Sequence, residues 1–512
     1  MKPKLKDKRG IRIQTRIIIS GVLILIQLAA LYAFAVNLSL VSTVLYEIIS
    51  AISVITVIFL LNKRGNPSYK IMWILFILLF PIFGISVYML WGTGTVFPYI
   101  KKRMEHCESH YVPFLESDED VHNRLSYHDF LHARQAAYLC HESGYPLYGN
   151  TEVEYLSPGE KFLPRFLEEL KKAEKYIYLE FFIVAEGVMW EQIYKILVEK
   201  AAVGIEIKLL FDDFGSIKRQ HKDFITRLQK QGIEVAVFNK INPSPNLFVN
   251  NRNHKKIVVI DGKLAVTGGL NLADEYINEF ERFGYWMDCA AIIKGDAVKS
   301  FLAMFCSTWE FTTGKRIDMI SHFAENTIQN NNFALPYCDD PLNEKNPAEG
   351  IYMQILNSAQ KYVYITTPYL IIDSAMITTL RHAAKSGIEV KIITPHIPDK
   401  WYVHPVTQYN YLELLESGVQ IYEYTPGFMH SKLFVSDDTV ATIGTVNMDY
   451  RSFMLHFECG VWISSQQTAL EIKNHFNELL SECEEIILEK WKKRGIFNRL
   501  KQAILHVFAP FM

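Results

Sequence analysis

The sequence predicts an α/β fold in which N-terminal transmembrane helices precede two homologous αβ lobes that form one pseudo-two-fold active site. Three observations support this prediction: long apolar segments among the first hundred residues, an internal duplication in the rest of the chain, and one polar motif that occurs in both copies. The 512 residues are 49% hydrophobic and 21% charged, which excludes a disordered or collagen-like chain. The net charge of −2 gives the whole chain no attraction to nucleic acid.

The N-terminal region has the pattern of a membrane anchor. A basic tail precedes a transmembrane region at 17–92, where three apolar segments of about 20 residues could each span a hydrocarbon core of about 30 Å. Pro81 and Gly84 interrupt the third segment, which is therefore either a full span or re-entrant. A cleaved signal peptide is the alternative for the first segment. Its apolar stretch, however, is longer than the apolar region of a typical signal peptide. The tail is 1–16, and the segments are 17–36, 40–61 and 71–91.

Basic residues predict the orientation of these segments, because Lys and Arg favour the cytoplasmic side of a bilayer. Lys63, Arg64 and Lys70 lie between the second and third segments, so this loop and the N-terminus should be cytoplasmic. If all three segments span, the lobes lie on the outer face of a bacterial cell membrane. If the third segment is re-entrant, they are cytoplasmic, and the basic run 101–103 and seven apparently unpaired cysteines favour that alternative.

The rest of the chain is an internal duplication. Within each copy, short β-rich runs alternate with helical patterns, which is typical of a mostly parallel sheet covered by helices. Four blocks recur in the same order at offsets of 186, 183, 186 and 176 residues, namely 173–179 with 359–365, 204–210 with 387–393, 232–237 with 418–423, and 254–261 with 430–437. We expect a helical connection at 93–150, a first lobe at 151–320, a linker at 321–347, a second lobe at 348–488 and a basic amphipathic helix at 489–512.

Each copy contains the motif His-x-Lys-x4-Asp, followed ten residues later by Asn. On a strand, His and Lys separated by one residue leave the same face, so an imidazole and an ammonium group point into one site. Two matches at equivalent points of a duplication are far less probable by chance than one. The two sets are His254, Lys256, Asp261 and Asn271 in the first copy, and His430, Lys432, Asp437 and Asn447 in the second.

Two such sets meeting across a pseudo-two-fold axis predict a phosphate site that needs no metal and no cofactor. The two lysines supply positive charge, and the two asparagines add neutral hydrogen-bond donors. One neutral imidazole can attack phosphorus as a nucleophile, while the other, protonated, gives its proton to the leaving alkoxide. Histidines in opposite protonation states predict a bell-shaped dependence of activity on pH.

Each imidazole also needs a group that fixes its tautomer. Asp288 and Glu458 stand at the start of equivalent strands in the two copies, so we predict that they orient the two histidines. The alternative is that both carboxylates are solvent-exposed strand ends.

From about residue 42 onward, these residues resemble the phospholipase D superfamily and, within it, the bacterial cardiolipin synthases. The resemblance rests on Trp73 and Pro81-x-x-Gly84 near the N-terminus and on the runs 253–262, 366–369, 424–432 and 444–452. It implies transfer of a phosphatidyl group between two phosphatidylglycerol molecules, giving cardiolipin and glycerol through a phosphohistidine. By the same resemblance, His254 is the nucleophile and His430 the general acid. Family members commonly begin with two apolar segments, so the third one here leaves the topology open.

The partners expected from this resemblance are phosphatidylglycerol and anionic membrane lipid, without nucleic acid. The helix at 489–512 either contacts anionic lipid or packs on the second lobe with its charges in solvent. A membrane-anchored phosphodiesterase that hydrolyses phospholipid or nucleic acid at the same site is an alternative function, and an inactive scaffold is another. Two complete motifs argue against the scaffold.

Overall fold

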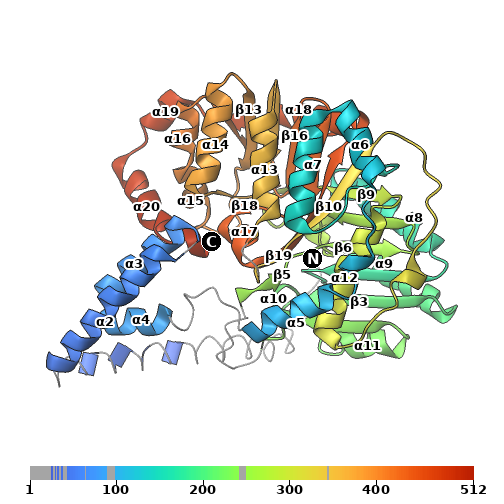
Figure 1. Ribbon diagram of the computed structural model, residues 1–512, viewed down its shortest axis with the longest axis horizontal. Coiled ribbons are helices and arrows are strands. Elements are labelled where there is room, and N and C mark those ends of the chain that lie inside the picture. The colour runs from blue at the N-terminus through green and yellow to red at the C-terminus, as the bar shows by residue number, and fades with distance from the viewer. Residues whose placement is uncertain are drawn as a thin grey trace, which may run out of the picture.

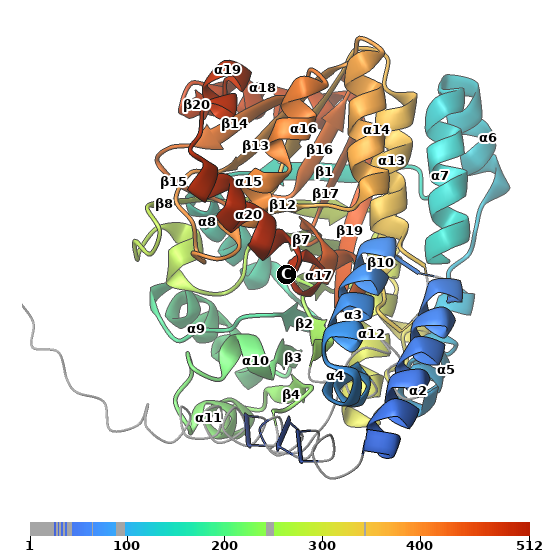
Figure 2. The same ribbon diagram turned by 90° about the vertical axis from the view of Figure 1, so that its left-hand side faces the viewer.

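The computed structural model describes residues 43–63, 65–88, 98–241, 250–342 and 345–512, together with seven isolated positions between 25 and 37. The predicted tail 1–16 and most of the predicted segment 17–36 lie outside the described residues. Two sheet-containing lobes lie one above the other, and the N-terminal helices α2 (Thr43–Asn62) and α3 (Pro67–Leu79) extend from their side (Figures 1 and 2).

The first lobe contains a seven-stranded mixed sheet. Its strands, in spatial order, are β1 (Glu152–Leu156), β9 (Ala290–Lys294), β7 (Leu264–Gly268), β6 (Ile257–Ile260), β2 (Tyr176–Phe181), β3 (Glu206–Asp212) and β4 (Glu234–Phe238). Only β2, β3 and β4 run parallel to one another, so the expectation of a mostly parallel sheet is wrong. The motif strand β6 returns at once as β7 through Asp261 and Gly262, both at positive φ, and such a tight turn joins antiparallel neighbours.

The second lobe repeats this strand order and adds β20 (Cys483–Glu485) at the far edge. Its strands are β10 (Phe333–Asp339), β19 (His456–Ser464), β17 (Val440–Gly444), β16 (Leu433–Ser436), β11 (Tyr362–Thr366), β13 (Glu389–Pro395) and β14 (Gln420–Tyr424). Strands that are equivalent in the two lobes therefore carry the equivalent motif residues.

Helix α12 (Val298–Thr313) joins the lobes into one body. It is buried along nearly its whole length, and its Phe301 and Phe305 belong to the same apolar cluster as Tyr178 of β2 and Trp462 of β19. This shared core fixes the position of one sheet relative to the other. The other main helices are α8 (Gly159–Lys172), α9 (Val188–Ala202) and α11 (Phe224–Lys230) in the first lobe, and α13 (Pro347–Ser358), α14 (Ser374–Lys385), α15 (His404–Tyr409), α16 (Tyr411–Glu416) and α18 (Gln466–Leu480) in the second.

The connection between the lobes differs from the linker expected at 321–347. Strand β10 lies within this range and pairs with β19 from Phe333, opposite Ser464, to Asp339, opposite Glu458. The sequence does not predict this strand, because an Asn-rich run precedes β10 and Pro336 lies inside it, and both are typical of a loop. Proline is tolerated here because β10 forms the edge of its sheet. The segment expected at 93–150 consists of α5 (Pro98–Glu108), α6 (Glu119–His128) and α7 (Phe130–Ser143).

The predicted third apolar segment, 71–91, is interrupted. Helix α3 ends at Leu79, and α4 (Pro81–Val87) begins after one intervening residue, Phe80, because proline lacks the N–H that a continuing helix needs. Asn66 caps the start of α3 by accepting a hydrogen bond from Ser68 N. None of the helices in the described part of the chain combines the length and the apolar character needed to cross a membrane.

The C-terminal segment packs on the second lobe. The helix expected at 489–512 is divided into α19 (Leu488–Lys492), α20 (Ile496–His506) and the short turn η6 (Ala509–Phe511). The ring of His506 stacks on Tyr409, with the centroids 4.0 Å apart, and Ala509 is buried in a cluster with Ile371. On its other face α20 leaves apolar side chains in solvent, including Phe497, which is 83% exposed.

Candidate active site

Each motif histidine is anchored to the opposite lobe. Strand β5 (Arg252–Asn253) precedes His254 and pairs in parallel with the start of β19, while β15 (Gly427–Met429) precedes His430 and pairs in parallel with β8 (Tyr285–Met287). As a result, His254 N donates to Phe457 O at 2.8 Å, and His430 N donates to Met287 O at 2.7 Å. The two contacts are equivalent under the duplication, so the histidines meet across the interface between the lobes.

The carboxylates Asp288 and Glu458 cross the same interface. His254 Nδ1 lies 2.9 and 2.8 Å from the two carboxylate oxygens of Glu458, and His430 Nδ1 lies 2.6 Å from Asp288 Oδ2. Both carboxylates are fully buried, so neither is an exposed strand end. Each lobe thus supplies the carboxylate for the histidine of the other lobe. With Nδ1 occupied, Nε2 is the ring nitrogen left for chemistry.

The two carboxylates are held by different neighbours. A Cβ atom at Gly269 would lie 2.0 Å from Asp288 Oδ1, so this position has room only for glycine. The equivalent residue of the second lobe is Thr445, which donates its hydroxyl to Glu458 Oε2. Asp288 therefore packs against bare backbone and accepts a hydrogen bond from Cys289 N at 2.8 Å, whereas Glu458 accepts a hydrogen bond from a side-chain hydroxyl.

Lys256 and Lys432 are buried beside the histidines. Lys256 Nζ donates to His254 O at 2.7 Å, and Lys432 Nζ donates to His430 O and lies 2.8 Å from His430 Nδ1. Neither ammonium forms an ion pair with a carboxylate of the described residues. Burial lowers the pKa of Lys256 to about 7 and that of Lys432 to about 8. A bound anion would favour the charged form of both lysines.

Both imidazoles are neutral at pH 7. Burial, aided by the nearby lysines, lowers the pKa of His430 to about 4 and holds the pKa of His254 well below its usual value. The carboxylate of Asp288 opposes this shift at His430 without reversing it. The opposite protonation states expected from the sequence therefore require an additional negative charge in the site.

The two motif asparagines are placed differently. Asn271 accepts a hydrogen bond from Ile183 N at 2.9 Å and donates to Tyr276 OH at 2.7 Å, which holds the tyrosine ring 5.6 Å from the His430 ring. Asn271 thus supports an aromatic wall of the site. Asn447 is 7% exposed; its side chain forms a hydrogen bond with Asp449, and its Oδ1 has no partner among the described residues.

The motif aspartates do not reach the histidines. Each stands at positive φ after its motif strand and accepts hydrogen bonds from three successive backbone N–H groups at 2.7 to 3.0 Å. The four residues between Lys and Asp carry the chain along the strand, away from the site. The structure thus separates these two residues from the catalytic set in which the motif placed them. Asp261 binds Glu174, Lys175 and Tyr176, and Asp437 binds Gln360, Lys361 and Tyr362.

A third histidine, His456, also borders the site. Its ring centroid lies 5.6 Å from that of His254, and its Nδ1 lies 3.7 Å from Glu458 Oε1. No spacing pattern in the sequence singled it out, because it is one histidine at the start of a strand. Ligand atoms of His254, His456 and Glu458 lie within 4.8 Å of one another, a spacing that could hold a metal ion. An ion there would compete with the hydrogen bond that orients His254.

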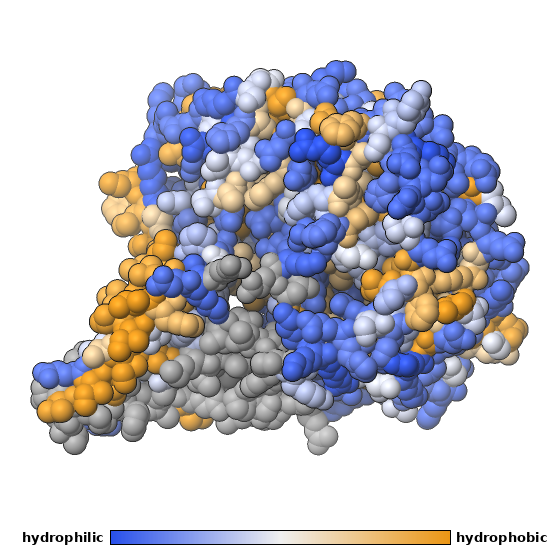
Figure 3. Space-filling model, viewed as in Figure 1, coloured by the Kyte–Doolittle hydropathy of each residue, from blue (hydrophilic) through white to orange (hydrophobic). Residues whose placement is uncertain are grey.

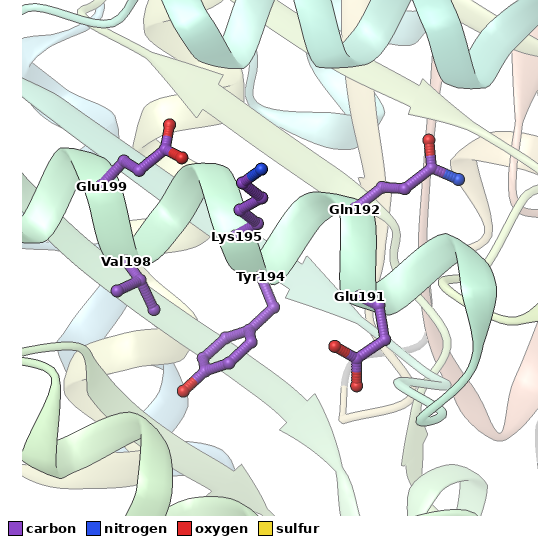
Figure 4. Close-up of a pocket in the computed structure, with 6 residues that line it drawn as sticks. All are labelled: Glu191, Gln192, Tyr194, Lys195, Val198 and Glu199. Atoms are coloured by element: carbon purple, nitrogen blue, oxygen red, sulfur yellow. The ribbon is translucent and has the colours of Figure 1, made fainter.

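A hollow of about 650 Å³ lies over helix α9, and none of the motif residues lines it (Figure 4). Its lining comes from a single helix, carries charges of both signs and contains no pair of nucleophile and base. We therefore place the active site at the two histidines. The hollow is lined by Glu191, Gln192, Tyr194, Lys195, Val198 and Glu199.

Comparisons with known proteins match both lobes and the N-terminal region to family models. The family described as "Cardiolipin synthase, PLD-like domain" matches residues 166–309 and 352–480, one match in each lobe, and the family "Phospholipase D-nuclease N-terminal" matches 48–92. The fold resembles the crystal structure of phosphatidylserine synthase from Haemophilus influenzae Rd KW20, with a TM-score of 0.56 and 15% identity over 74% of this chain and 98% of that one.

Curated relatives match nearly the full chain. A cardiolipin synthase from Geobacillus sp. (strain WCH70) is 31% identical over 91% of this chain and 93% of its own length. Cardiolipin synthase 2 from Bacillus anthracis is 31% identical over 91% and 90%, and an uncharacterized protein from Streptococcus mutans is 38% identical over 89% and 99%. With two lobes that match the family separately and relatives that match along their whole length, the chain belongs to the cardiolipin synthase family of phospholipase D-like proteins.

Proposed function

We propose that the chain transfers a phosphatidyl group from one phosphatidylglycerol to a second, producing cardiolipin and glycerol. Membership of this family identifies it as a phosphatidyltransferase. The observation that supports the finer statement is the pair of buried histidines, each held at Nδ1 by a carboxylate of the opposite lobe and each beside a lysine with no ion-pair partner in the described chain. Such a site can bind one phosphodiester and transfer it in two steps.

In the first step His254 Nε2 attacks phosphorus, and the bond from phosphorus to the glycerol oxygen of the donor breaks. His430 gives its proton to that oxygen, so glycerol leaves neutral and the phosphatidyl group stays on His254. In the second step the hydroxyl of the acceptor lipid gives its proton to His430 and forms a bond to phosphorus. The phosphorus–nitrogen bond breaks, and its electron pair returns to the imidazole.

The donor supplies the charge that this scheme needs. Without an anion both histidines are neutral, which suits the nucleophile but not the acid. A phosphodiester bound near Lys432 and His430 adds a negative charge, which raises the pKa of the Lys432 ammonium and of the His430 imidazole. The acid is therefore protonated mainly when substrate is bound. His254, attacking phosphorus, must remain neutral.

Attachment to a membrane is part of the proposal. Apolar side chains are exposed along α2 and α3, for example Ile55 at 65% and Leu79 at 71%, and Figure 3 shows this surface together with a second apolar patch near α20. The match of residues 48–92 to a phospholipase D N-terminal family supports a membrane association of this region. A lipid surface would cover these side chains and bring acceptor hydroxyl groups to the site at high local concentration.

The proposed orientation, with the lobes outside the cell, rests on the basic residues between the second and third apolar segments. Gln329 is exposed, so Gln329→Cys on a cysteine-free background gives a suitable label site. A membrane-impermeant maleimide should label this variant in intact cells. Labelling only after lysis would place the lobes in the cytoplasm.

The function is tested by incubating the purified full-length protein with phosphatidylglycerol labelled in its headgroup glycerol, in vesicles. We expect cardiolipin and free glycerol in equal amounts, with no loss of rate in EDTA. If phosphatidic acid were the main product, the protein would be a hydrolase, and the proposed transfer would be wrong. If EDTA inhibited the reaction and a divalent cation restored it, the metal-free mechanism would be wrong.

A further inference from the structure

Arg451 is a half-buried cation next to the site, and the two-step scheme does not use it. It lies on α17 (Tyr450–Met454), and its Nε donates to His456 Nε2 at 3.4 Å. The ring of His456 is in turn 5.6 Å from that of His254, so a single imidazole separates the guanidinium from the proposed nucleophile. Burial lowers the pKa of His456 to about 3, so it stays neutral and can accept this hydrogen bond.

The guanidinium has no carboxylate partner among the described residues. Asp449, the nearest acid in the chain, uses its Oδ1 to cap α17 by accepting a hydrogen bond from Ser452 N at 2.7 Å. Apart from His456, the hydrogen-bond partner of the Arg451 side chain is a neutral carbonyl, Phe511 O, at 3.3 Å from Nη1. The negative charge of Asp449 offsets part of the cost of burying the guanidinium, but Asp449 forms no direct ion pair with it. A half-buried cation whose direct partners are neutral can still accept a further anion.

The backbone also fixes Arg451 in place. Arg451 N donates to Met512 O at 3.1 Å, and η6 is seated between α17 and the N-terminal helices, where the ring of Phe511 lies 5.8 Å from that of Trp73. The arginine is thus held by segments next to α20 and α3, which carry the exposed apolar surface. An anion reaching it from a lipid layer would arrive beside that surface.

The position equivalent to Arg451 in the first lobe carries an acid instead of a cation. Counting from Asn271 and Asn447, the position that corresponds to Arg451 is Glu275, and it is neutralised by Arg219 and Arg282, the latter at 3.0 Å. Of these two equivalent positions, Arg451, on the His254 side of the pseudo-two-fold axis, is the one that carries a cation. A site that binds two identical lipids in different roles needs such a difference between its halves.

We infer that Arg451 forms a second phosphate-binding subsite, which recognises the phosphodiester of the acceptor lipid. The phosphate of the transferred phosphatidyl group is bound at the same time by the two motif lysines. This inference rests on the proposed function. The two phosphates of cardiolipin are joined by one glycerol, so the phosphate of the acceptor must lie close to the reacting phosphorus in the second step. A fork of N–H donors suits a phosphate, and the subsite favours a phosphorylated alcohol over free glycerol or water.

Two reactions of one enzyme preparation separate this subsite from the rest of the machinery. Cardiolipin formation requires an acceptor that carries a phosphate, whereas exchange of labelled glycerol into phosphatidylglycerol requires the same phosphohistidine and an acceptor without one. For Arg451→Gln we expect the ratio of cardiolipin formation to glycerol exchange to fall about 10- to 100-fold, the size of losing one hydrogen bond to a charged group. Arg451→Lys keeps the charge but not the fork, and should give an intermediate ratio.

Arg381→Gln is the matched control, because Arg381 pairs with Glu413 on the surface of the same lobe and should leave the ratio within twofold of the wild type. A ratio for Arg451→Gln and Arg451→Lys that also stays within twofold would overturn the inference, and so would an equal loss of both reactions. If the wild type exchanges glycerol but makes no cardiolipin, the proposed function fails instead, so the two failures can be told apart.

Discussion

The two halves of the active site share one backbone plan but differ in the groups that surround each histidine. His254 faces Glu458, which Thr445 fixes by a hydrogen bond, and the neutral ring of His456. His430 faces Asp288, packed against Gly269, and lies among aromatic rings, with the Trp286 centroid 5.0 Å away. The duplication thus explains how two histidines reach one site, and the later divergence of their neighbours explains how they can take different roles.

The largest effects should follow from removing either histidine, and the choice of donor should reveal their difference. His254→Ala and His430→Ala should each abolish cardiolipin formation, because nucleophile and acid act as a unit. With a phosphatidyl donor whose leaving group is p-nitrophenol, no proton is needed, and only His430→Ala should regain release of p-nitrophenol, by about 10²- to 10⁴-fold over its rate with the natural donor.

Release of p-nitrophenol is followed spectrophotometrically. His141→Ala serves as the control, since the His141 side chain is 86% exposed and distant in sequence from both motifs. Equal recovery by both variants would remove the distinction between the two halves.

A smaller loss should come from crowding the carboxylate on one side only. Gly269→Ala pushes a methyl group against Asp288, tilts His430 and should lower kcat by about 100-fold, in the range seen for groups that orient a reacting residue. Thr445→Val removes one hydrogen bond to Glu458 and should lower kcat by about 10-fold.

Gly495→Ala is the control for these variants, because a Cβ atom there meets nothing within 4 Å. Steady-state assays of cardiolipin formation at saturating lipid give the comparison. Full activity in Gly269→Ala would show that Asp288 does not position His430.

The dependence of kcat/KM on pH should distinguish lysines from histidines. Lys256 and Lys432, with pKa values of about 7 and 8, lose their charge as pH rises, so activity should fall above this range. Burial and the nearby lysines hold the pKa of His254, which must be neutral to attack phosphorus, well below its usual value, so the acid limb should lie well below the usual histidine value. Lys432→Arg, which cannot lose its charge, should leave an alkaline limb near 7 due to Lys256 alone. An acid limb at 6 to 7 in the wild type would contradict the neutral pair.

The smallest effect on chemistry should come from the motif aspartates, whose removal should lower stability instead. Asp261→Ala and Asp437→Ala each leave three backbone N–H groups without their acceptor and should cost about 1–3 kcal/mol. Because Asp261 is buried and Asp437 is partly exposed, the first-lobe variant should have the lower thermal midpoint. Below that midpoint, kcat per folded molecule should stay within a few-fold of the wild type. A thousandfold lower kcat in folded protein would return these residues to the catalytic set.

The sequence predicted the duplicated lobes and the paired motif residues that lie together in the candidate site, because both depend on local patterns. The alternation of His and Lys along a strand, and the carboxylates at equivalent strand starts, are of this kind. It could not show that Glu458 serves His254 and Asp288 serves His430, because that exchange depends on β5 pairing with β19 and β15 with β8 across the lobes. Long-range pairing of this sort has no periodic signature.

Other features were hidden for equally specific reasons. The strand β10 contains a proline and follows an Asn-rich run, so the sequence predicted a linker there. The fixed spacing from histidine to aspartate suggested a shared site, although five positions along a strand separate the motif lysine from the aspartate. Arg451 lies in one of the runs that resemble the family. The sequence could not show that its direct contacts are neutral groups, because those contacts depend on the three-dimensional structure.

The central claim is that the phosphatidyl group rests covalently on His254. It is tested by mixing His430→Ala protein with the p-nitrophenyl donor, quenching at alkaline pH where phosphohistidine survives, and locating the adduct by mass spectrometry of the digested chain. We predict a phosphatidyl adduct on the peptide that contains His254 and none in the variant that also carries His254→Ala. An adduct elsewhere, or product release with no adduct at any time point, would contradict the covalent mechanism.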